Sequence, residues 1–135
     1  MNSILIVEDE PLVAFDDEHA LQRAGYVVAA TVDRIAAARE VMAERDVDLV
    51  VVDMGLREDN GGLGVARHAG ERGIPVLFST AACPPEAWSY GLACLAKPHS
   101  ARDLVRAVHV IDAFVAGHPI PEPPAGLTFF RQHEA

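Results

Sequence analysis

Basic side chains are scarce in this sequence, which has 11 lysines and arginines against 20 aspartates and glutamates and a formal net charge of −9. Nucleic-acid binding normally needs clustered Lys and Arg that neutralise backbone phosphates. We therefore do not expect this chain to bind DNA or RNA directly. Lys97 is the only lysine, since every other basic residue is an arginine, and a compact ammonium group at this one position points to a specific use.

Cysteine and long apolar runs are also scarce. The two cysteines, Cys83 and Cys94, follow no metal-ligand spacing and are too few for a disulfide framework, which favours a reducing compartment. A short apolar run separates Ser3 from Glu8, so the first residues lack the basic start of a signal peptide and the length of a membrane span. We expect a cytoplasmic protein that makes no membrane contact.

The length and the apolar content indicate one folded domain. The sequence has 135 residues, and a single hydrophobic core typically organises about 100 to 200 residues. Half of the residues are apolar and 23% are charged, which is ordinary for a globular protein and too hydrophobic for a disordered one. One core and one functional site are therefore expected.

Short apolar runs alternate with segments of helical periodicity. Residues 4–7 (Ile-Leu-Ile-Val) and 49–52 (Leu-Val-Val-Val) are typical of strands buried on both faces of a parallel sheet. Because each right-handed crossover must cover a face of that sheet, the pattern predicts a doubly wound α/β fold with a five-stranded parallel sheet. The expected strands are residues 4–7, 26–30, 49–52, 76–78 and 92–96, and the expected helices are 11–24, 33–45, a short one ending near 73, and 100–116.

Two helix starts carry capping signals. Ser100 with Asp103 three residues later resembles a capping box, and Asp33 is expected to cap the helix that follows it. The crossover after the fourth strand is short, because residues 81–91 fall below the usual minimum of about a dozen and contain two prolines. We expect the fourth helix to be short or mobile.

The composition changes after Gly117 to His-Pro-Ile-Pro-Glu-Pro-Pro, which is typical of an extended segment. We expect a domain over residues 1–117 and an extended arm over residues 118–135. The arm is too short to hold an output domain.

Polar side chains follow four of the expected strands. Glu8 and Asp9 come after the first strand, Asp53 after the third, Thr80 after the fourth and Lys97 after the fifth. In an open α/β sheet, ligands bind beyond the carboxyl ends of the strands. We therefore expect these five side chains to form one site.

The chemistry of these side chains fits phosphoryl transfer. Three converging carboxylates repel one another and have an obvious counter-ion in Mg²⁺, which prefers oxygen ligands. Asp53 is then placed as a nucleophile that forms an aspartyl phosphate. Thr80 can donate a hydrogen bond to the phosphoryl group, and Lys97 supplies a cation.

Residues 3–116 resemble the receiver domain of bacterial response regulators. In this resemblance Glu8 and Asp9 match the acidic pair of the family, and Asp53 matches the phosphoacceptor. Thr80 matches the switch hydroxyl, and Lys97 matches the lysine of a Lys-Pro pair that is usually joined by a cis peptide.

The resemblance implies further features. The family has the flavodoxin-like strand order 2-1-3-4-5, and the backbone carbonyl of Gly55 would be the remaining protein ligand of Mg²⁺. The loop over residues 54–62 lacks the usual proline and, with residues 73–80, resembles an alphaproteobacterial subgroup with a Phe-Ala-Thr-Gly motif, many members of which are single-domain. Cys94 stands where the family usually has an aromatic switch residue.

We therefore expect a stand-alone receiver that accepts a phosphoryl group on Asp53 from a histidine kinase or a histidine phosphotransfer protein. It would bind Mg²⁺, signal through contacts with a downstream protein, and catalyse only its own phosphorylation and dephosphorylation. Because residues 81–91 follow Thr80, we also expect phosphorylation to order them into a partner-binding face with Trp88.

Three other functions stay open. The chain could serve as a phosphate sink, or it could sequester a kinase or regulator without being phosphorylated. A third alternative is an aspartyl-phosphate phosphohydrolase of the haloacid-dehalogenase type. That class needs a second aspartate two residues after the nucleophile, where this sequence has Gly55.

Overall fold

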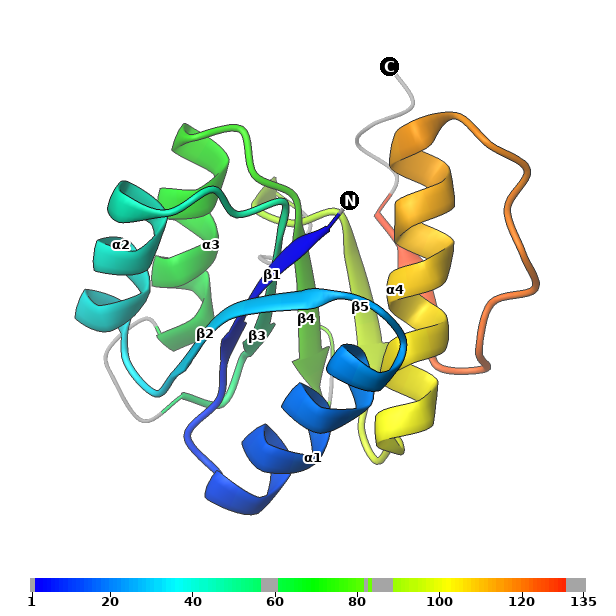
Figure 1. Cartoon of the computed structure of the whole chain (residues 1–135), viewed down its shortest axis with the longest axis horizontal. Helices are drawn as coiled ribbons and strands as arrows, with labels where there is room; N and C mark the ends of the chain where they lie inside the picture. The colour runs from blue at the N-terminus through cyan, green and yellow to red at the C-terminus, as the bar shows by residue number, and fades with distance from the viewer. Residues whose placement is uncertain (1, 57–60, 82, 84–88, 131–135) are drawn as a thin grey trace.

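The computed structural model describes residues 2–56, 61–81, 83 and 89–130 (Figure 1). Within these residues, strands and helices alternate largely as the apolar pattern predicts. Their bounds are β1 (Ser3–Val7), α1 (Pro11–Arg23), β2 (Val27–Val32), α2 (Ile35–Glu44), β3 (Leu49–Asp53), α3 (Gly61–Glu71), β4 (Val76–Thr80), β5 (Ala93–Ala96), α4 (Ala101–Ala116) and β6 (Leu127–Phe129).

The strands form one sheet in the order β2-β1-β3-β4-β5-β6. The first five strands are parallel, which confirms the α/β class and the order 2-1-3-4-5. A sixth strand, β6, extends the five-stranded sheet that we expected and runs antiparallel to β5. An antiparallel edge strand is a common addition to an otherwise parallel sheet.

Helices cover both faces of the sheet because successive strand residues point to opposite faces. In β1, Ile4 and Ile6 belong to the core beneath α1 and α4, whereas Leu5 and Val7 belong to the core beneath α2 and α3 (Figure 1). Complete burial of one such aliphatic side chain contributes about 1.5–3 kcal/mol. The layered core therefore holds the strand ends in place, and with them the polar residues of the site.

The helix starts differ in how they are capped. At the start of α4, the Asp103 N–H donates to Ser100 Oγ at 3.0 Å and the Ser100 N–H donates to Asp103 Oδ2 at 3.3 Å, as the capping box predicts. The expectation for Asp33 is wrong, because α2 starts at Ile35 and its N-cap is Arg34, with no side-chain cap. Among the described residues, no helix is long and apolar enough to cross a membrane.

The arm that we expected to be extended provides β6. The chain leaves the end of α4, runs back alongside it and returns next to β5 (Figure 1). The Leu127 N–H donates to the Pro124 carbonyl at 3.2 Å, which closes a turn and directs the chain into the strand. The aromatic residue that follows, Phe130, is 4% exposed and anchors the segment in the core.

Three expectations involve residues outside the described ones. The short or mobile fourth helix and the face around Trp88 involve residues 84–88, and the loop after β3 includes residues 57–60. All three stay predictions.

Candidate functional site

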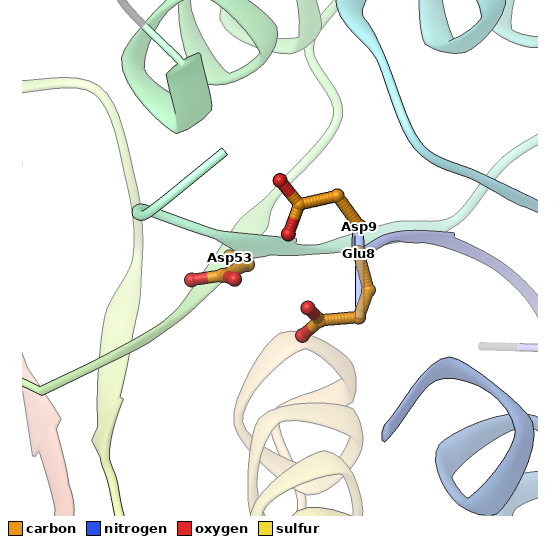
Figure 2. A group of neighbouring side chains, drawn as sticks. All are labelled: Glu8, Asp9 and Asp53. Carbon is orange, nitrogen blue, oxygen red and sulfur yellow. The ribbon is translucent and has the colours of Figure 1, made fainter. Parts of the chain in front are cut away.

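Three carboxylates meet at the carboxyl end of the sheet. Glu8 and Asp9 follow β1, and Asp53 is the last residue of the neighbouring strand β3. One carboxylate oxygen from each residue lies within 4.8 Å of the other two. Figure 2 shows the three carboxyl groups gathered at the strand ends. The structure thus brings together the carboxylates that the sequence singles out, and Glu8 and Asp53 are buried there.

Glycines fix the position of Asp53. The Gly55 N–H donates to Asp53 Oδ1 at 2.8 Å, so one carboxylate oxygen is held by the backbone. A Cβ at Gly62 would lie 2.9 Å from the Asp53 carbonyl oxygen, closer than packed atoms allow. Only glycine at position 62 therefore lets the first turn of α3 pack against the end of β3. The orientation of the Gly55 carbonyl toward a metal stays a prediction.

Glu8 carries the clearest electrostatic signature. Burial raises the pKa of its carboxyl to about 7, and the negative charge of Asp53 contributes to the rise. The Glu10 N–H, which donates to Glu8 Oε2 at 3.1 Å, and the Lys97 ammonium act in the opposite direction. Burial and a like charge thus outweigh these two favourable contacts.

Lys97 faces the carboxylates from the end of β5. Its Nζ lies 3.4 Å from Asp53 Oδ2 and 3.8 Å from Glu8 Oε1. Its backbone N–H donates to the Thr80 carbonyl at 2.7 Å, and the peptide bond to Pro98 is cis, as the resemblance implies. The ammonium is therefore within reach of any group bound to Asp53.

Thr80 is the last residue of β4, and its side chain is buried. It lies in register with Ala96, the residue before Lys97. The structure therefore places Thr80 at the same sheet edge as Asp53 and Lys97. The hydrogen bond from its hydroxyl group to a phosphoryl group stays a prediction.

Three polar residues near this edge have no counterpart in the sequence analysis. Ser79 Oγ and His99 Nε2 are 2.7 Å apart and form a hydrogen bond between β4 and the segment that follows β5. Asp17 is buried on α1 and interacts electrostatically with Lys97. The available signal for Asp17 is its spacing from Ala14 and Leu21, the other buried residues of α1.

Asp17 provides a test of this electrostatic environment. Burial, with a smaller effect from Asp16, raises the pKa of Asp17 from 3.8 to about 6, while Lys97 opposes the rise. The folded chain therefore binds this proton more tightly than the unfolded chain, and the free energy of unfolding falls as the pH rises from about 4 through 6. The full penalty above pH 7 is at most about 3 kcal/mol.

We therefore expect Asp17→Asn to raise the free energy of unfolding above about pH 7 and to leave it nearly unchanged near pH 4. Urea unfolding of both proteins across this pH range measures the difference. Asp16→Asn, at an exposed neighbouring position, is the matched control, and because Asp16 makes only a smaller contribution to the raised pKa of Asp17, it should show only a small part of this gain. Parallel curves for wild type and Asp17→Asn would show that Asp17 carries no such penalty.

The donor set fits a hard divalent cation. The cluster of Glu8, Asp9 and Asp53 offers only carboxylate oxygens, which Mg²⁺ prefers. A cation among them would offset the burial and the like charge that raise the pKa of Glu8. These residues could therefore hold Mg²⁺.

Known protein families and solved structures include receiver domains that are similar to this chain. The pattern of the response regulator receiver domain matches residues 4–109. A response regulator receiver protein from Sinorhizobium medicae WSM419 is 30% identical, with 79% of this chain and 90% of that chain covered and a TM-score of 0.68. The receiver domain of the TMAO respiratory system response regulator TorR is 27% identical, with 86% and 98% covered and a TM-score of 0.70.

A curated protein matches over a shorter stretch. The TorCAD operon transcriptional regulatory protein TorR of Escherichia coli (strain K12) is 38% identical over 58 residues, which are 43% of this chain and 25% of that protein. The aligned part of the chain thus spans a quarter of the length of this relative. The activity of that whole protein is therefore not carried over to this chain.

Proposed function

The chain belongs to the response regulator receiver domain family of two-component systems, and from this premise we propose that it accepts a phosphoryl group on the Asp53 carboxylate. The donor would be a phosphohistidine of a histidine kinase or of a histidine phosphotransfer protein. The observation that carries this proposal is the position of Asp53, which shares its site with two carboxylates and lies 3.4 Å from the Lys97 ammonium.

The reaction balances with the groups present. A carboxylate oxygen of Asp53 forms the new bond to phosphorus, the bond from phosphorus to the donor imidazole nitrogen breaks, and that nitrogen keeps the electron pair. Lys97 would neutralise charge on the transferred group, and the Thr80 hydroxyl would donate a hydrogen bond to it. Glu8, Asp9 and Asp53 would hold Mg²⁺, which when bound supplies positive charge to the phosphoryl oxygens.

The finer features of the proposal follow from the resemblance. We propose a cytoplasmic, stand-alone receiver of the Phe-Ala-Thr-Gly subgroup that signals through a downstream protein and catalyses only its own phosphorylation and dephosphorylation. A phosphate sink would use the same site. Phosphorylation-independent sequestering would leave the Asp53 and Lys97 arrangement without a use, and a phosphohydrolase would lack its second aspartate, because Gly55 stands there.

Acetyl phosphate tests the proposal directly. Incubation with acetyl phosphate and Mg²⁺ should add the mass of one phosphoryl group, and peptide mapping should place that group within residues 49–56. Replacing Mg²⁺ with a chelator should remove the adduct. If neither acetyl phosphate nor a phosphohistidine donor gives an adduct, the chain acts without phosphorylation and the sequestering alternative takes its place.

Lys97→Ala separates the role of the lysine from that of the metal ligands. We expect the variant to fold and to bind Mg²⁺ at least as tightly as the wild type, because the ammonium lies near oxygens of Glu8 and Asp53 and competes with the cation. Phosphorylation should slow about a hundredfold, the usual cost of losing one charge-stabilising group. Isothermal titration calorimetry and the time course of the adduct measure the two effects.

The matched control is Lys97→Arg, which keeps the charge but changes its shape. It should fold like Lys97→Ala and be phosphorylated faster than it. If Lys97→Ala is unfolded, the lysine is structural and its proposed role is wrong.

A further inference from the structure

The outer edge of β5 is paired with the arm of the same chain. Residues 127–129 form β6 and pair with residues 93–95. The family match ends at residue 109, so it includes β5 but not β6. The pairing needs an explanation from the residues of this chain.

One end of β6 is anchored in the core at the far end of β5. The Phe130 N–H donates to the Leu92 carbonyl at 3.0 Å, and the Phe130 ring centroid lies 6.2 Å from that of Phe78. A Cβ at Gly91 would lie 2.4 Å from the Phe78 ring and 3.3 Å from the Phe130 ring. Glycine at position 91 thus leaves room for the rings of Phe78 and Phe130 to pack together.

The opposite end of β6 lies beside Ala96, the residue before Lys97. The Ala96 N–H donates to the Gly126 carbonyl at 3.0 Å, and the next N–H, that of Lys97, donates to the Thr80 carbonyl at 2.7 Å. The backbone at Ala96 and Lys97 is therefore hydrogen-bonded to the arm on one side and to the end of β4 on the other. Without the arm, this four-residue strand would be the edge of the sheet and would have a ladder on one side only.

We propose that the arm is a positioning element for Lys97. By pairing with the edge of β5, residues 126–130 fix the backbone that leads to Lys97, and thereby hold its ammonium 3.4 Å from Asp53. The proposal deepens the proposed function, because it names a segment that tunes the phosphoryl-transfer site. A displacement of about 1 Å in a catalytic group can lower the reaction rate about a hundredfold. Loss of arm pairing should therefore lower the rate of phosphorylation measurably.

The coupling must also act in the reverse direction. If arm pairing favours the position of Lys97 that meets a phosphoryl group, then a phosphoryl group on Asp53 must stabilise arm pairing by the same free energy. A strand that only widened the sheet would stabilise the fold by the same amount whether or not Lys97 is present and Asp53 is phosphorylated. The two roles are therefore distinguishable.

Thr128 is the position at which to release the arm. Its side chain is exposed, and its backbone pairs with Cys94 in the middle of β6. Thr128→Pro removes a backbone N–H from the strand without changing a core side chain. Thr128→Ala keeps the N–H and is the matched control.

The first measurement uses the fact that Lys97 is the only lysine. Protein labelled with carbon-13 in lysine gives one set of lysine side-chain NMR signals. In Thr128→Pro these signals should move toward those of an exposed lysine, and in Thr128→Ala they should not. Unchanged lysine signals in a Thr128→Pro protein whose β6 amides exchange freely would overturn the proposal.

The second measurement is the rate of phosphorylation by acetyl phosphate. Thr128→Pro should lower it about tenfold, should not lower Mg²⁺ affinity, and should have no further effect in a Lys97→Ala background. An equal loss in both backgrounds would show that the arm does not act through Lys97. If the wild type takes no phosphoryl group, the proposed function fails, and the lysine spectrum alone decides whether the arm positions Lys97.

The third measurement is amide hydrogen exchange with and without a beryllofluoride phosphate mimic. The mimic should increase protection of residues 126–130 in the wild type and not in Lys97→Ala, and equal increases would contradict the coupling. Thermal unfolding monitors the fold of every variant. If Thr128→Pro does not fold, Phe130→Leu replaces it, because this change weakens the anchor and keeps an apolar side chain.

Discussion

Asp53→Asn should abolish the phosphoryl adduct while the protein stays folded. The amide has nearly the shape of the carboxylate, so the hydrogen bond from the Gly55 N–H to the side-chain oxygen can persist. An amide oxygen is a much weaker nucleophile than a carboxylate, and the bond to phosphorus does not form. Intact mass after incubation with acetyl phosphate and Mg²⁺ measures the loss.

The same substitution should change the titration of the cluster. The Asp53 charge helps to raise the pKa of Glu8, so Asp53→Asn should lower that pKa toward its usual value. Because the pKa of Glu8 is raised from 4.5 to about 7 in the folded chain, its ionisation lowers the free energy of unfolding as the pH rises from about 4.5 through 7. Asp53→Asn, by lowering this pKa, should therefore stabilise the metal-free protein at pH 8. A stable variant that takes no phosphoryl group separates loss of the nucleophile from loss of the fold.

The matched control is Asp46→Asn, which removes a carboxylate from an exposed position. It should be phosphorylated like the wild type. An adduct that persists in Asp53→Asn would mean that another residue accepts the phosphoryl group, and the site would have to be reassigned.

The sheet and its site edge could be predicted from the sequence because they depend on local patterns. The run Leu-Val-Val-Val at residues 49–52 is short and rich in β-branched valine, which favours a buried strand, and the polar residue after it is Asp53. The carboxyl ends of parallel strands lie at one edge of a sheet. Residues distant in sequence, such as Glu8 and Lys97, could therefore be assigned to one site because each follows a strand that is expected to be parallel.

The arm and Asp17 could not be predicted because their positions depend on tertiary packing. Residues 127–130 show a short apolar pattern after several prolines, and nothing in it names β5 as the partner. The pattern also gives no sign that Phe130 would join the core cluster of Cys94, the position where the resemblance leads us to expect an aromatic residue. Asp17 has the helical spacing of the buried Ala14 and Leu21, but a carboxylate is assigned to the surface by default, and the packing of α1 shows that this one is buried.

Asp9→Ala should abolish both Mg²⁺ binding and phosphorylation. Asp9 supplies one of three carboxylate oxygens that lie within 4.8 Å of one another. Mg²⁺ keeps several water ligands and depends on a small number of carboxylates, so losing one of three should weaken its binding at least about a hundredfold. Isothermal titration calorimetry measures the binding, and intact mass measures the adduct.

The free energy of unfolding of Asp9→Ala, measured with and without Mg²⁺, distinguishes a lost metal ligand from a damaged fold. Without metal, Asp9→Ala removes one of the mutually repelling carboxylates, so the free energy of unfolding should stay the same or rise. With saturating Mg²⁺ the wild type should have the higher free energy of unfolding, because it gains binding free energy that the variant cannot. Asp16→Ala removes an exposed carboxylate from the neighbouring helix and should gain as much stability from Mg²⁺ as the wild type does. Undiminished phosphorylation of Asp9→Ala would reject this carboxylate cluster as the metal site.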